Sequence, residues 1–233
     1  MAKKPTKPIK VTAYLKDGRL NSTDGIIMLD SILYHAWFLK NAPWVLEGNG
    51  KEFSGYIGLP LMQLPGNRWA ASRGIYKEIE KTVEHFNKRP DFFGAEKAEY
   101  LENDTGIISS SVGIYRAYRM PQVIRTIEDG KIEFWARGHK DEVKNLLDGI
   151  PALGKKYAMG YGIVESWKVE DCEEDYSLWH PEYGLMRPVE VGSIEETTCD
   201  LSGYPIMDYA TKPPYWKEIN FKRCYVPVKD VGL

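Results

Sequence analysis

The 233-residue chain is poor in cysteine and histidine and has no long uninterrupted apolar run. Its three cysteines lie far apart and form no Cys-x-x-Cys pair, which argues against a disulfide framework and a zinc site. The longest apolar stretch, residues 25–39, is interrupted by Asp30 and His35, and no signal peptide is visible at the N-terminus. We therefore expect a reduced, soluble, cytoplasmic protein with no membrane contact.

An excess of basic residues is also lacking. The formal net charge is −2, so the bulk positive charge of a freestanding nucleic-acid binder is missing. The chain is 43% hydrophobic and 12% aromatic, which suffices for a packed core and excludes global disorder. Any site for a polyanion must therefore come from local clustering of basic side chains.

Hydrophobic periodicity indicates a regular order of strands and helices. Alternation of apolar and polar residues predicts strands at 9–15, 131–137 and 162–169. Helical patterns predict a helix at 25–40, capped by Asp24, and a second helix at 139–147. Weaker patterns predict strands at 53–64, 107–118 and 122–126, and a helix at 75–87.

In this order the elements match the split βαβ, ferredoxin-like plan, an antiparallel sheet with two helices on one face. The predicted fold class is α+β, with a ferredoxin-like (RRM-like) domain over residues 1–170. Residues 65–122 differ in residue composition from the segments around them, and we interpret them as an insertion or an elaborated hairpin arm between the central strands. Residues 171–233, rich in Pro, Tyr and Trp, predict an extended C-terminal tail that wraps around the domain.

The connection before the last predicted strand, LGKKYAMGYG at residues 153–162, concentrates glycine and positive charge. Glycine lets the backbone approach a phosphate, and runs of N–H groups bind anions. Lys155 and Lys156 add charge, while Tyr157 and Tyr161 have rings that can stack on bases. The alternative is a loose surface loop with incidental lysines.

Residues 149–156 also fit most of a phosphate-binding loop of nucleotide hydrolases. Two features reject that interpretation. Lys156 occupies the position of the Ser or Thr that binds magnesium, and the segment joins a helix to a strand rather than a strand to a helix. We therefore expect no nucleotide cofactor at this loop.

The pattern of Gly154, five residues including lysine, and Gly160-x-Gly162 resembles the glycine-rich loop of the RAMP superfamily of CRISPR-associated RNA-binding proteins. A wider resemblance is to one subunit of type IV CRISPR effector complexes. It is carried by VTAYLKDGRLNSTDGIIMLDSILYHAW, GIYRAYRMP and the run from KIEFWARG to LGKKYAMGYG. In that family the subunit is the counterpart of the RAMP protein that caps the five-prime handle of the guide RNA.

The resemblance implies binding of CRISPR RNA and assembly with backbone RAMP subunits and the large subunit of an antiviral effector complex. Contact with target nucleic acid would come through that complex, and the resemblance implies no catalysis by this chain. It assigns handle phosphates to the glycine loop at Gly154, Lys155, Lys156, Gly160 and Gly162. Tyr157 and Tyr161 remain candidates for base stacking on the chemistry of their rings alone.

Two further clusters are candidates for RNA contact. Arg116, Tyr118 and Arg119 would be presented by a strand toward single-stranded RNA, and the alternative is ordinary strand surface with cross-strand pairing. Arg68, Trp69 and Arg73 lie in the insertion, where related capping subunits carry a projecting thumb. A core position for Trp69 is the alternative there.

Catalysis is the remaining question, because several RAMP relatives cleave precursor guide RNA without metal, using a histidine as general acid or base. His35 is the most interesting of the four histidines, since a helix-one histidine serves this purpose in some processing nucleases. We expect a flanking, non-catalytic role for it and no metal site.

The predicted function is a non-catalytic subunit that caps the handle and nucleates complex assembly. A metal-independent CRISPR-RNA-processing endoribonuclease is the alternative, and a scaffold that contacts only proteins is a third option.

Overall fold

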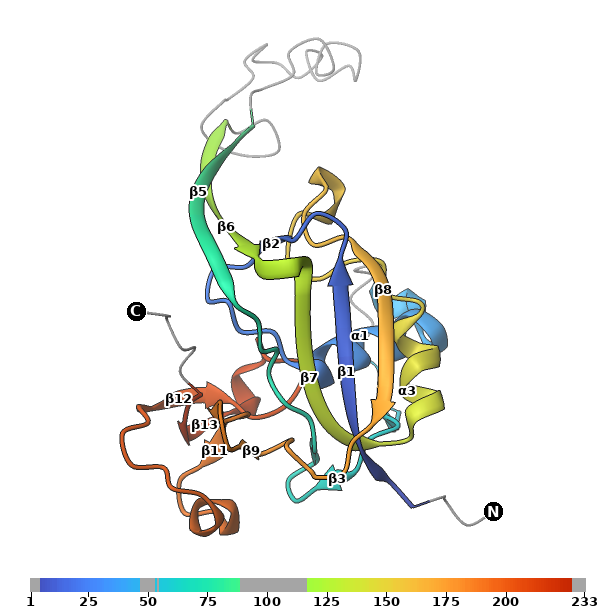
Figure 1. Ribbon diagram of the computed structural model, residues 1–233, viewed down its shortest axis with the longest axis vertical. Helices are drawn as coiled ribbons and strands as arrows, with labels where there is room; N and C mark the ends of the chain where they lie inside the picture. The colour runs from blue at the N-terminus through green and yellow to red at the C-terminus, as the bar shows by residue number, and fades with distance from the viewer. Residues whose placement is uncertain (1–4, 47–52, 54, 89–116, 228–233) are drawn as a thin grey trace, which may run out of the picture.

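A computed structural model describes residues 5–46, 53, 55–88 and 117–227 of the chain. At its centre is an antiparallel three-stranded sheet in the order β7–β1–β8 (Figure 1). The strands are β1 (Lys7–Leu15), β7 (Lys131–Gly138) and β8 (Val164–Asp171). The three strands predicted most clearly by alternation are therefore confirmed.

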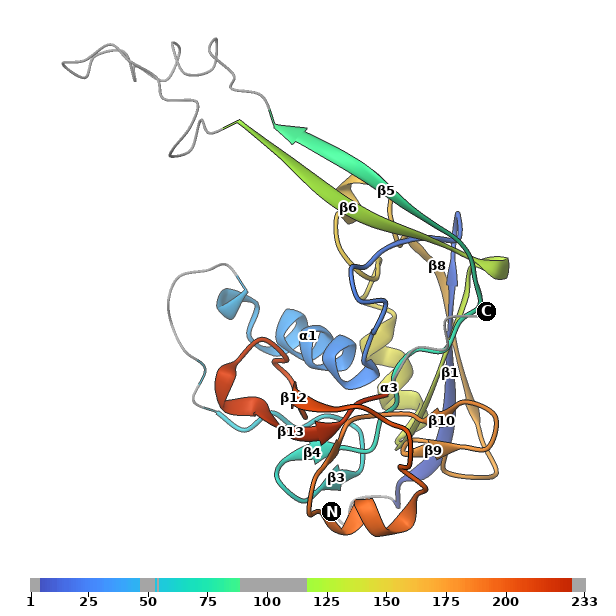
Figure 2. The same cartoon turned by 90° about the vertical axis from the view of Figure 1, so that its left-hand side faces the viewer.

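Two helices cover one face of this sheet, α1 (Leu29–Asn41) and α3 (Lys140–Leu147), as Figure 2 shows from the side. Their apolar faces and the inward side chains of the strands form one buried cluster around Phe134. Sheet and helices thus share a single core. The core positions the connections at the end of the sheet, where the glycine loop lies.

The first helix begins four residues later than predicted, because Asp24 does not cap it. One Asp24 carboxylate oxygen instead accepts hydrogen bonds from the Ile26 amide at 3.1 Å and from the Ser22 hydroxyl at 3.3 Å. These bonds close a turn before α1. The helix ends at Asn41, one residue beyond the predicted end at Lys40.

Residues 61–75 lie along the free edge of β7. Isolated antiparallel bridges join Leu61 to Gly138, Ala71 to Ala136 and Ile75 to Glu133. Within this segment β3 (Gln63–Leu64) and β4 (Arg68–Trp69) pair with each other. The strand predicted over residues 53–64 is therefore wrong for most of its described length, and the start of the predicted insertion belongs to the sheet edge.

A two-stranded antiparallel arm projects from the body (Figures 1 and 2). Its strands are β5 (Glu78–Lys88) and β6 (Tyr118–Ile127), and β2 (Arg19–Asn21) pairs with the base of β6. The helix predicted at 75–87 is wrong, because that segment is mostly β5. The strand predicted at 122–126 is confirmed within β6, whereas most of the strand predicted at 107–118 lies outside the described residues.

Beyond residue 171 the chain builds a small unit of its own, which we call the C-terminal unit (residues 172–227). Its three-stranded sheet has the order β11–β13–β12, and Leu185, Val189 and Leu201 form its buried cluster. The strands are β9 (Trp179–His180), β10 (Gly184–Leu185), β11 (Val189–Glu190), β12 (Ile206–Ala210) and β13 (Phe221–Tyr225). The prediction of an extended tail is thus incomplete.

Short 3₁₀ helices complete the described elements. They are η1 (Pro43–Val45), η3 (Glu128–Gly130), η4 (Tyr157–Met159), η5 (Ile194–Thr198) and η6 (Glu218–Asn220).

Candidate functional site

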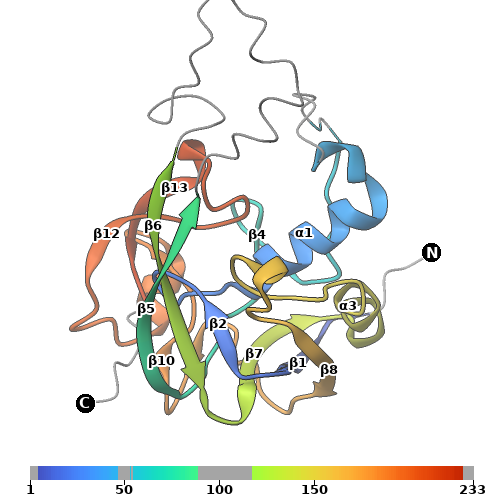
Figure 3. The same cartoon turned by 90° about the horizontal axis from the view of Figure 1, so that it is seen from above.

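The glycine loop between α3 and β8 is docked against β2. The Lys155 amide donates to the Asn21 carbonyl at 2.9 Å, and the Gly162 amide donates to the Arg19 carbonyl at 2.7 Å. A third bond closes the base of the loop, from the Leu153 amide to the Gly162 carbonyl at 2.8 Å. Because both strands of its base are tied to neighbouring backbone, the interpretation as a loose connection is wrong. Figure 3 shows the loop in gold between the arm and α1.

The three loop glycines occupy different surroundings. All have positive φ, the backbone region that favours glycine. A Cβ atom at Gly154 would lie 2.5 Å from the Asn21 carbonyl oxygen, and one at Gly162 would lie 2.0 Å from the Leu153 carbonyl oxygen. A Cβ atom at Gly160 would have no heavy atom within 4 Å. Gly154 and Gly162 therefore permit close backbone packing, and only Gly160 stands in open space.

Several backbone amides of the loop are not free to bind an anion. Besides Lys155 and Gly162, the amides of Met159 and Gly160 donate to the carbonyls of Lys156 and Tyr157 at 2.8 Å each. With the Leu153 amide, five of the loop amides are thus already used inside the protein. Side chains, rather than backbone N–H groups, must supply most of any contact with a ligand.

The two loop tyrosines differ in exposure. Tyr157 is 62% exposed, so its ring is open to a partner. Tyr161 is 6% exposed; its hydroxyl donates to Glu84 of β5, and the Arg19 guanidinium lies over its ring at 4.8 Å. The prediction that Tyr161 stacks on a base is therefore wrong, because its ring and hydroxyl join the loop to the base of the arm.

The lysine pair meets the arm. Lys155 is exposed, whereas Lys156 is half-buried with its Nζ 4.5 Å from the centre of the Phe86 ring. On the same face of the arm the rings of Phe86 and Tyr118 lie 6.0 Å apart, and Lys88 Nζ lies 5.9 Å from the Tyr118 ring. These residues form what we call the loop–arm surface: Phe86, Lys88, Tyr118, Lys155, Lys156 and Tyr157.

The arm places Tyr118 and Arg119, two members of the cluster predicted at residues 116–119, on opposite faces. Lys88 pairs with Tyr118 and Asn87 pairs with Arg119. Since successive side chains of a strand point to opposite faces, Arg119 lies on the face turned away from Tyr118. Tyr118 therefore belongs to the loop–arm surface and Arg119 does not, while Arg116 lies outside the described residues.

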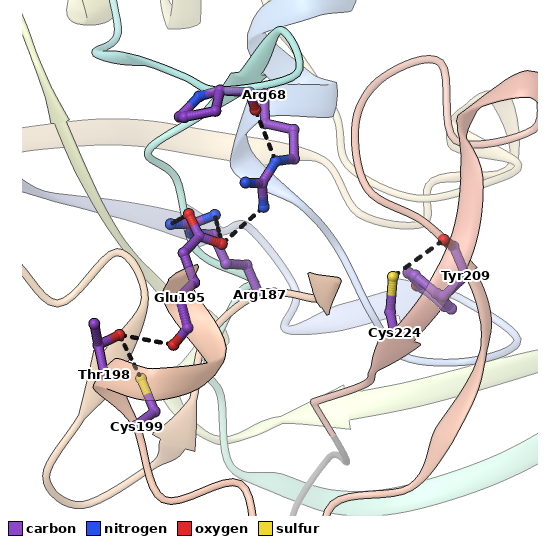
Figure 4. A network of polar contacts seen from close by, with 8 residues as sticks. Arg68, Arg187, Glu195, Thr198, Cys199, Tyr209 and Cys224 are labelled. Atoms are coloured by element: carbon purple, nitrogen blue, oxygen red, sulfur yellow. Dashed lines mark hydrogen bonds and ion pairs between the residues drawn. The ribbon is translucent and has the colours of Figure 1, made fainter. Parts of the chain in front are cut away.

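The residues predicted to form a projecting thumb are buried in the body. Trp69 is 7% exposed and lies in the main core, which confirms the alternative interpretation. Arg68 is 6% exposed, and its guanidinium donates to Glu195 at 2.7 Å and to the Pro65 carbonyl at 3.0 Å (Figure 4). Arg73 is 4% exposed and its Nε lies 3.4 Å from the Leu185 carbonyl oxygen. The thumb assignment of Arg68, Trp69 and Arg73 is therefore wrong.

A groove of about 610 Å³ opens beside the glycine loop. Its walls come from the loop, from the turn before α1, from one side of α1 and from the C-terminal unit. The polar and aromatic residues that line it are Asn21, Ser22, Thr23, Asp24, Ser31, His35, Lys155, Tyr157, Tyr209 and Tyr215. No sequence pattern predicted that Tyr209 and Tyr215 of the C-terminal unit would line this groove.

Burial sets the ionisation of two groups in this groove. Partial desolvation lowers the pKa of His35, whose side chain is otherwise exposed, and this favours the neutral imidazole. Burial raises the pKa of Tyr209 to about 12, with Asp24 and Asp30 adding to the effect, so the phenol keeps its proton. Both groups therefore offer hydrogen bonds without charge.

Two further properties bear on the function. Within the described ranges no three His, Cys, Asp or Glu side chains gather closely enough to hold a metal ion. None of the described helices has the length and apolar character needed to cross a membrane.

Comparison with known proteins places the chain in a family. The family described as CRISPR type IV associated protein Csf3 matches residues 7–227. Curated proteins give no match. Among solved structures, a chain of "Cryo-EM structure of the Type III-B Cmr-beta bound to cognate target RNA" is similar at 11% identity with a TM-score of 0.34. That alignment covers 72% of this chain and 61% of the other chain, so this protein spans less than two thirds of its length. Because the family match extends over almost the whole sequence, the chain belongs to the family of CRISPR type IV associated protein Csf3.

Proposed function

We propose that the protein is a non-catalytic RNA-binding subunit of a type IV CRISPR effector complex. In this role it caps the five-prime handle of the guide RNA and nucleates assembly with backbone RAMP subunits and the large subunit. The family membership supports the CRISPR context. The observation that carries RNA binding is the loop–arm surface, where lysines and exposed or half-buried rings alternate. Lysines bind backbone phosphates and aromatic rings stack on bases in single-strand binding proteins.

The arrangement of the sheet supports a ferredoxin-like RAMP fold. Across it the order is β8, β1, β7 and the bridged segment 61–75, with neighbouring segments antiparallel and both helices on one face. This is the strand order that the split βαβ plan requires. The glycine loop lies between the last helix and the last strand of that order.

The open face of the sheet suits RNA less well than the loop–arm surface. Lys10 and Lys131 lie 2.6 and 2.7 Å from the same Glu133 carboxylate oxygen, and Lys168 lies 2.9 Å from Glu170. These cations are paired within the sheet. A phosphate backbone would have to compete with their carboxylates, whereas no ion pair among the described residues involves Lys155 or Lys156.

The test is the salt dependence of RNA binding by the variant Lys155→Ala with Lys156→Ala. We expect weaker binding of a labelled CRISPR repeat RNA and a shallower slope of log affinity against log salt. Each lost phosphate contact removes roughly 0.7 from the slope on single strands, so two contacts remove about 1.4. A matched control is Lys131→Ala with Lys168→Ala on the open face, which should leave the slope unchanged. An equal slope in the loop variant and wild type would contradict the assignment.

Capping of the handle is tested separately. Guide RNA without its five-prime handle should bind more weakly than guide RNA shortened by the same length at its three-prime end. Equal losses would leave RNA binding standing and would reject the end-specific role.

A metal-independent endoribonuclease is the second candidate, favoured by one observation. His35 lines the groove that also contains Lys155, and partial desolvation lowers its pKa, which favours the neutral imidazole that can accept a proton. Repeat RNA incubated with the protein and a chelator tests this candidate. Cleavage that His35→Ala abolishes would establish it, whereas intact RNA that is retained in a gel shift would exclude it.

A further inference from the structure

We infer that the groove between the glycine loop, α1 and the C-terminal unit holds one unstacked nucleotide of the bound RNA, with Tyr209 forming part of its wall. This inference rests on the proposed RNA binding and extends it to a part of the chain for which the sequence suggested no ligand.

The groove opens directly beside the proposed path of the RNA. Lys155 and Tyr157 belong both to the loop–arm surface and to the lining of the groove. A strand that contacts these two side chains therefore passes the mouth of the groove. The volume of about 610 Å³ lies within the roughly 300–1,000 Å³ of small-molecule sites and leaves room for one base and its ribose.

The charges in the groove fit one phosphate and no more. Lys155 is the single lysine or arginine among the lining residues, all of which lie in the described part of the chain. One oxygen of the Asp24 carboxylate accepts hydrogen bonds from Ser22 and Ile26, and the carboxylate keeps its negative charge, so a phosphate belongs at Lys155 and not beside this turn. The neutral forms of His35 and Tyr209 are favoured for the reasons given above.

The remaining lining groups suit a base and a ribose. Buried side chains of Ile32, Ile150 and Leu153 supply an apolar wall. Hydroxyl groups on Ser22, Thr23, Ser31 and Tyr209, together with the His35 imidazole, supply donors and acceptors without charge. An apolar cleft with a few convergent polar groups is the usual form of a site for a nucleotide-sized ligand.

The tyrosine wall is held in place before any ligand arrives. Tyr209 is in β12 and pairs with Lys222 of β13. The hydroxyl of Tyr215 donates to the buried carboxylate of Asp30, with oxygen–oxygen distances of 2.9 and 3.1 Å. Since Asp30 lies in the first turn of α1, this bond fixes the C-terminal unit to the opposite wall of the groove. A preformed site avoids the ordering cost of binding.

Photocrosslinking identifies the nucleotide and its protein neighbours. Repeat RNA carrying 4-thiouridine or 6-thioguanosine at one position at a time is irradiated with the full-length protein, and crosslinked peptides are mapped by mass spectrometry. We expect one position to crosslink both to the peptide with Tyr157 and to the peptide with Tyr209. Crosslinks at Tyr157 with none at the Tyr209 peptide from any position would overturn the inference. They would leave the proposed RNA binding intact.

Filling the groove provides a second measurement. Ser31→Trp places a large ring in the groove, and Ser31→Ala is its matched control. We expect Ser31→Trp to weaken repeat RNA binding at least tenfold with an unchanged salt slope, because the phosphate contacts at Lys155 and Lys156 remain. Ser31→Ala should bind within twofold of wild type.

A folded Ser31→Trp variant with wild-type affinity would also overturn the inference. If this variant does not fold, Tyr209→Ala replaces it, with Trp216→Ala as control. Trp216 also belongs to the C-terminal unit, is 78% exposed and does not line the groove. Equal affinities of these two variants would count against the inference, and a loss confined to Tyr209→Ala would support it. If instead the variant Lys155→Ala with Lys156→Ala binds RNA with the same salt slope as wild type, the proposed function itself is rejected.

Discussion

Single glycines of the glycine loop have different structural roles, which substitutions can distinguish. Gly162 has a φ of +67°, and a Cβ atom there would lie 2.0 Å from the Leu153 carbonyl oxygen. Gly160 has a φ of +92° but open space around it. An alanine at position 162 would have both an unfavourable backbone conformation and a steric clash. An alanine at position 160 would have the unfavourable conformation alone.

We therefore predict that Gly162→Ala lowers the free energy of unfolding by about 3 kcal/mol or more. Gly160→Ala should lower it by about 1–2 kcal/mol, the cost of the left-handed conformation. Urea unfolding of the two variants measures the difference. Equal losses would mean that the loop relaxes away from Leu153 and that its close packing is not required.

The two loop tyrosines give a second prediction. Tyr157→Ala should weaken RNA binding by about 1–3 kcal/mol, the contribution of one stacked base, with little change in stability. Tyr161→Phe removes the hydroxyl that donates to Glu84 and should lower stability by about 1 kcal/mol while RNA affinity stays the same. Affinity and melting temperature measured on both variants separate the roles. A loss of RNA affinity in Tyr161→Phe would contradict this division.

At the scale of elements, the arm has two faces with different properties. Phe86, Lys88 and Tyr118 lie on the face toward the loop, and Val83, which is 56% exposed, lies on the other face. Both faces carry apolar side chains in similar positions. Only the face toward the loop combines them with the lysine pair.

We expect Phe86→Ala to weaken repeat RNA binding by about 1–3 kcal/mol, because it removes a ring from the loop–arm surface. Val83→Ala is the matched control on the opposite face and should bind as wild type does. Fluorescence anisotropy with labelled repeat RNA measures both affinities. Equal effects of the two variants would contradict the assignment of RNA contact to the face of the arm that carries Phe86.

Sequence patterns predicted those elements whose local pattern and long-range pairing agree. The strand at 131–137 alternates, and the helix at 139–147 has one apolar face, so both were found. Between residues 75 and 87 the spacing of Ile75, Ile79, Val83 and Phe86 has a helical period, yet pairing with β6 makes most of the segment a strand, β5. That error hid Phe86 and Lys88, which complete the surface around the predicted lysines.

Burial by distant segments explains the other failures at the site. Arg68 and Trp69 have the composition of an exposed nucleic-acid cluster, but Glu195 lies 127 positions from Arg68 and pairs with it inside the protein. Tyr209 likewise reaches the groove only because the C-terminal unit folds back onto α1. No local pattern carries such information. The role of the lysine pair stays a prediction: Lys155 is exposed, whereas the half-buried position of Lys156 depends on Phe86 of the arm.

At the scale of the whole molecule, buried polar contacts join the C-terminal unit to the body. Glu195 accepts from Arg68 at 2.7 Å and from Arg187 at 3.0 Å (Figure 4). Burial raises the pKa of Glu195, but the charges and hydrogen bonds of Arg187 and Arg68 outweigh burial, so the pKa lies below its usual value. The ionised carboxylate therefore stabilises the fold at neutral pH, and this contribution is lost as pH falls through that pKa.

We predict that Glu195→Gln lowers the free energy of unfolding by about 3 kcal/mol, since it leaves two buried guanidinium groups without their counter-ion. Hydrogen exchange should increase mainly in the C-terminal unit. Glu165→Gln, at an exposed position of β8, is the control and should have little effect. A loss below about 1 kcal/mol would indicate that the two arginines find other acceptors.

The contact between Asp30 and Tyr215 predicts a pH dependence of the opposite sign. Burial raises the pKa of Asp30 to about 7, although the Tyr215 hydrogen bond and the charge of Arg187 act to lower it. Between the pKa of an unfolded Asp, about 4, and this value the folded state binds the proton more tightly. The free energy of unfolding that depends on Asp30 therefore falls as pH rises through this window and is constant above it.

Asp30→Asn cannot ionise and should lack this dependence. From pH 5 to pH 8 wild type should lose on the order of 2 kcal/mol more than the variant, because each unit of pKa difference corresponds to about 1.4 kcal/mol. Urea unfolding of both proteins at the two pH values gives this difference, in which contributions from other titrating groups cancel. Parallel losses would show that Asp30 stays ionised in its buried site. The Tyr215 hydrogen bond would then compensate for burial, and the attachment of the C-terminal unit to α1 would not respond to pH.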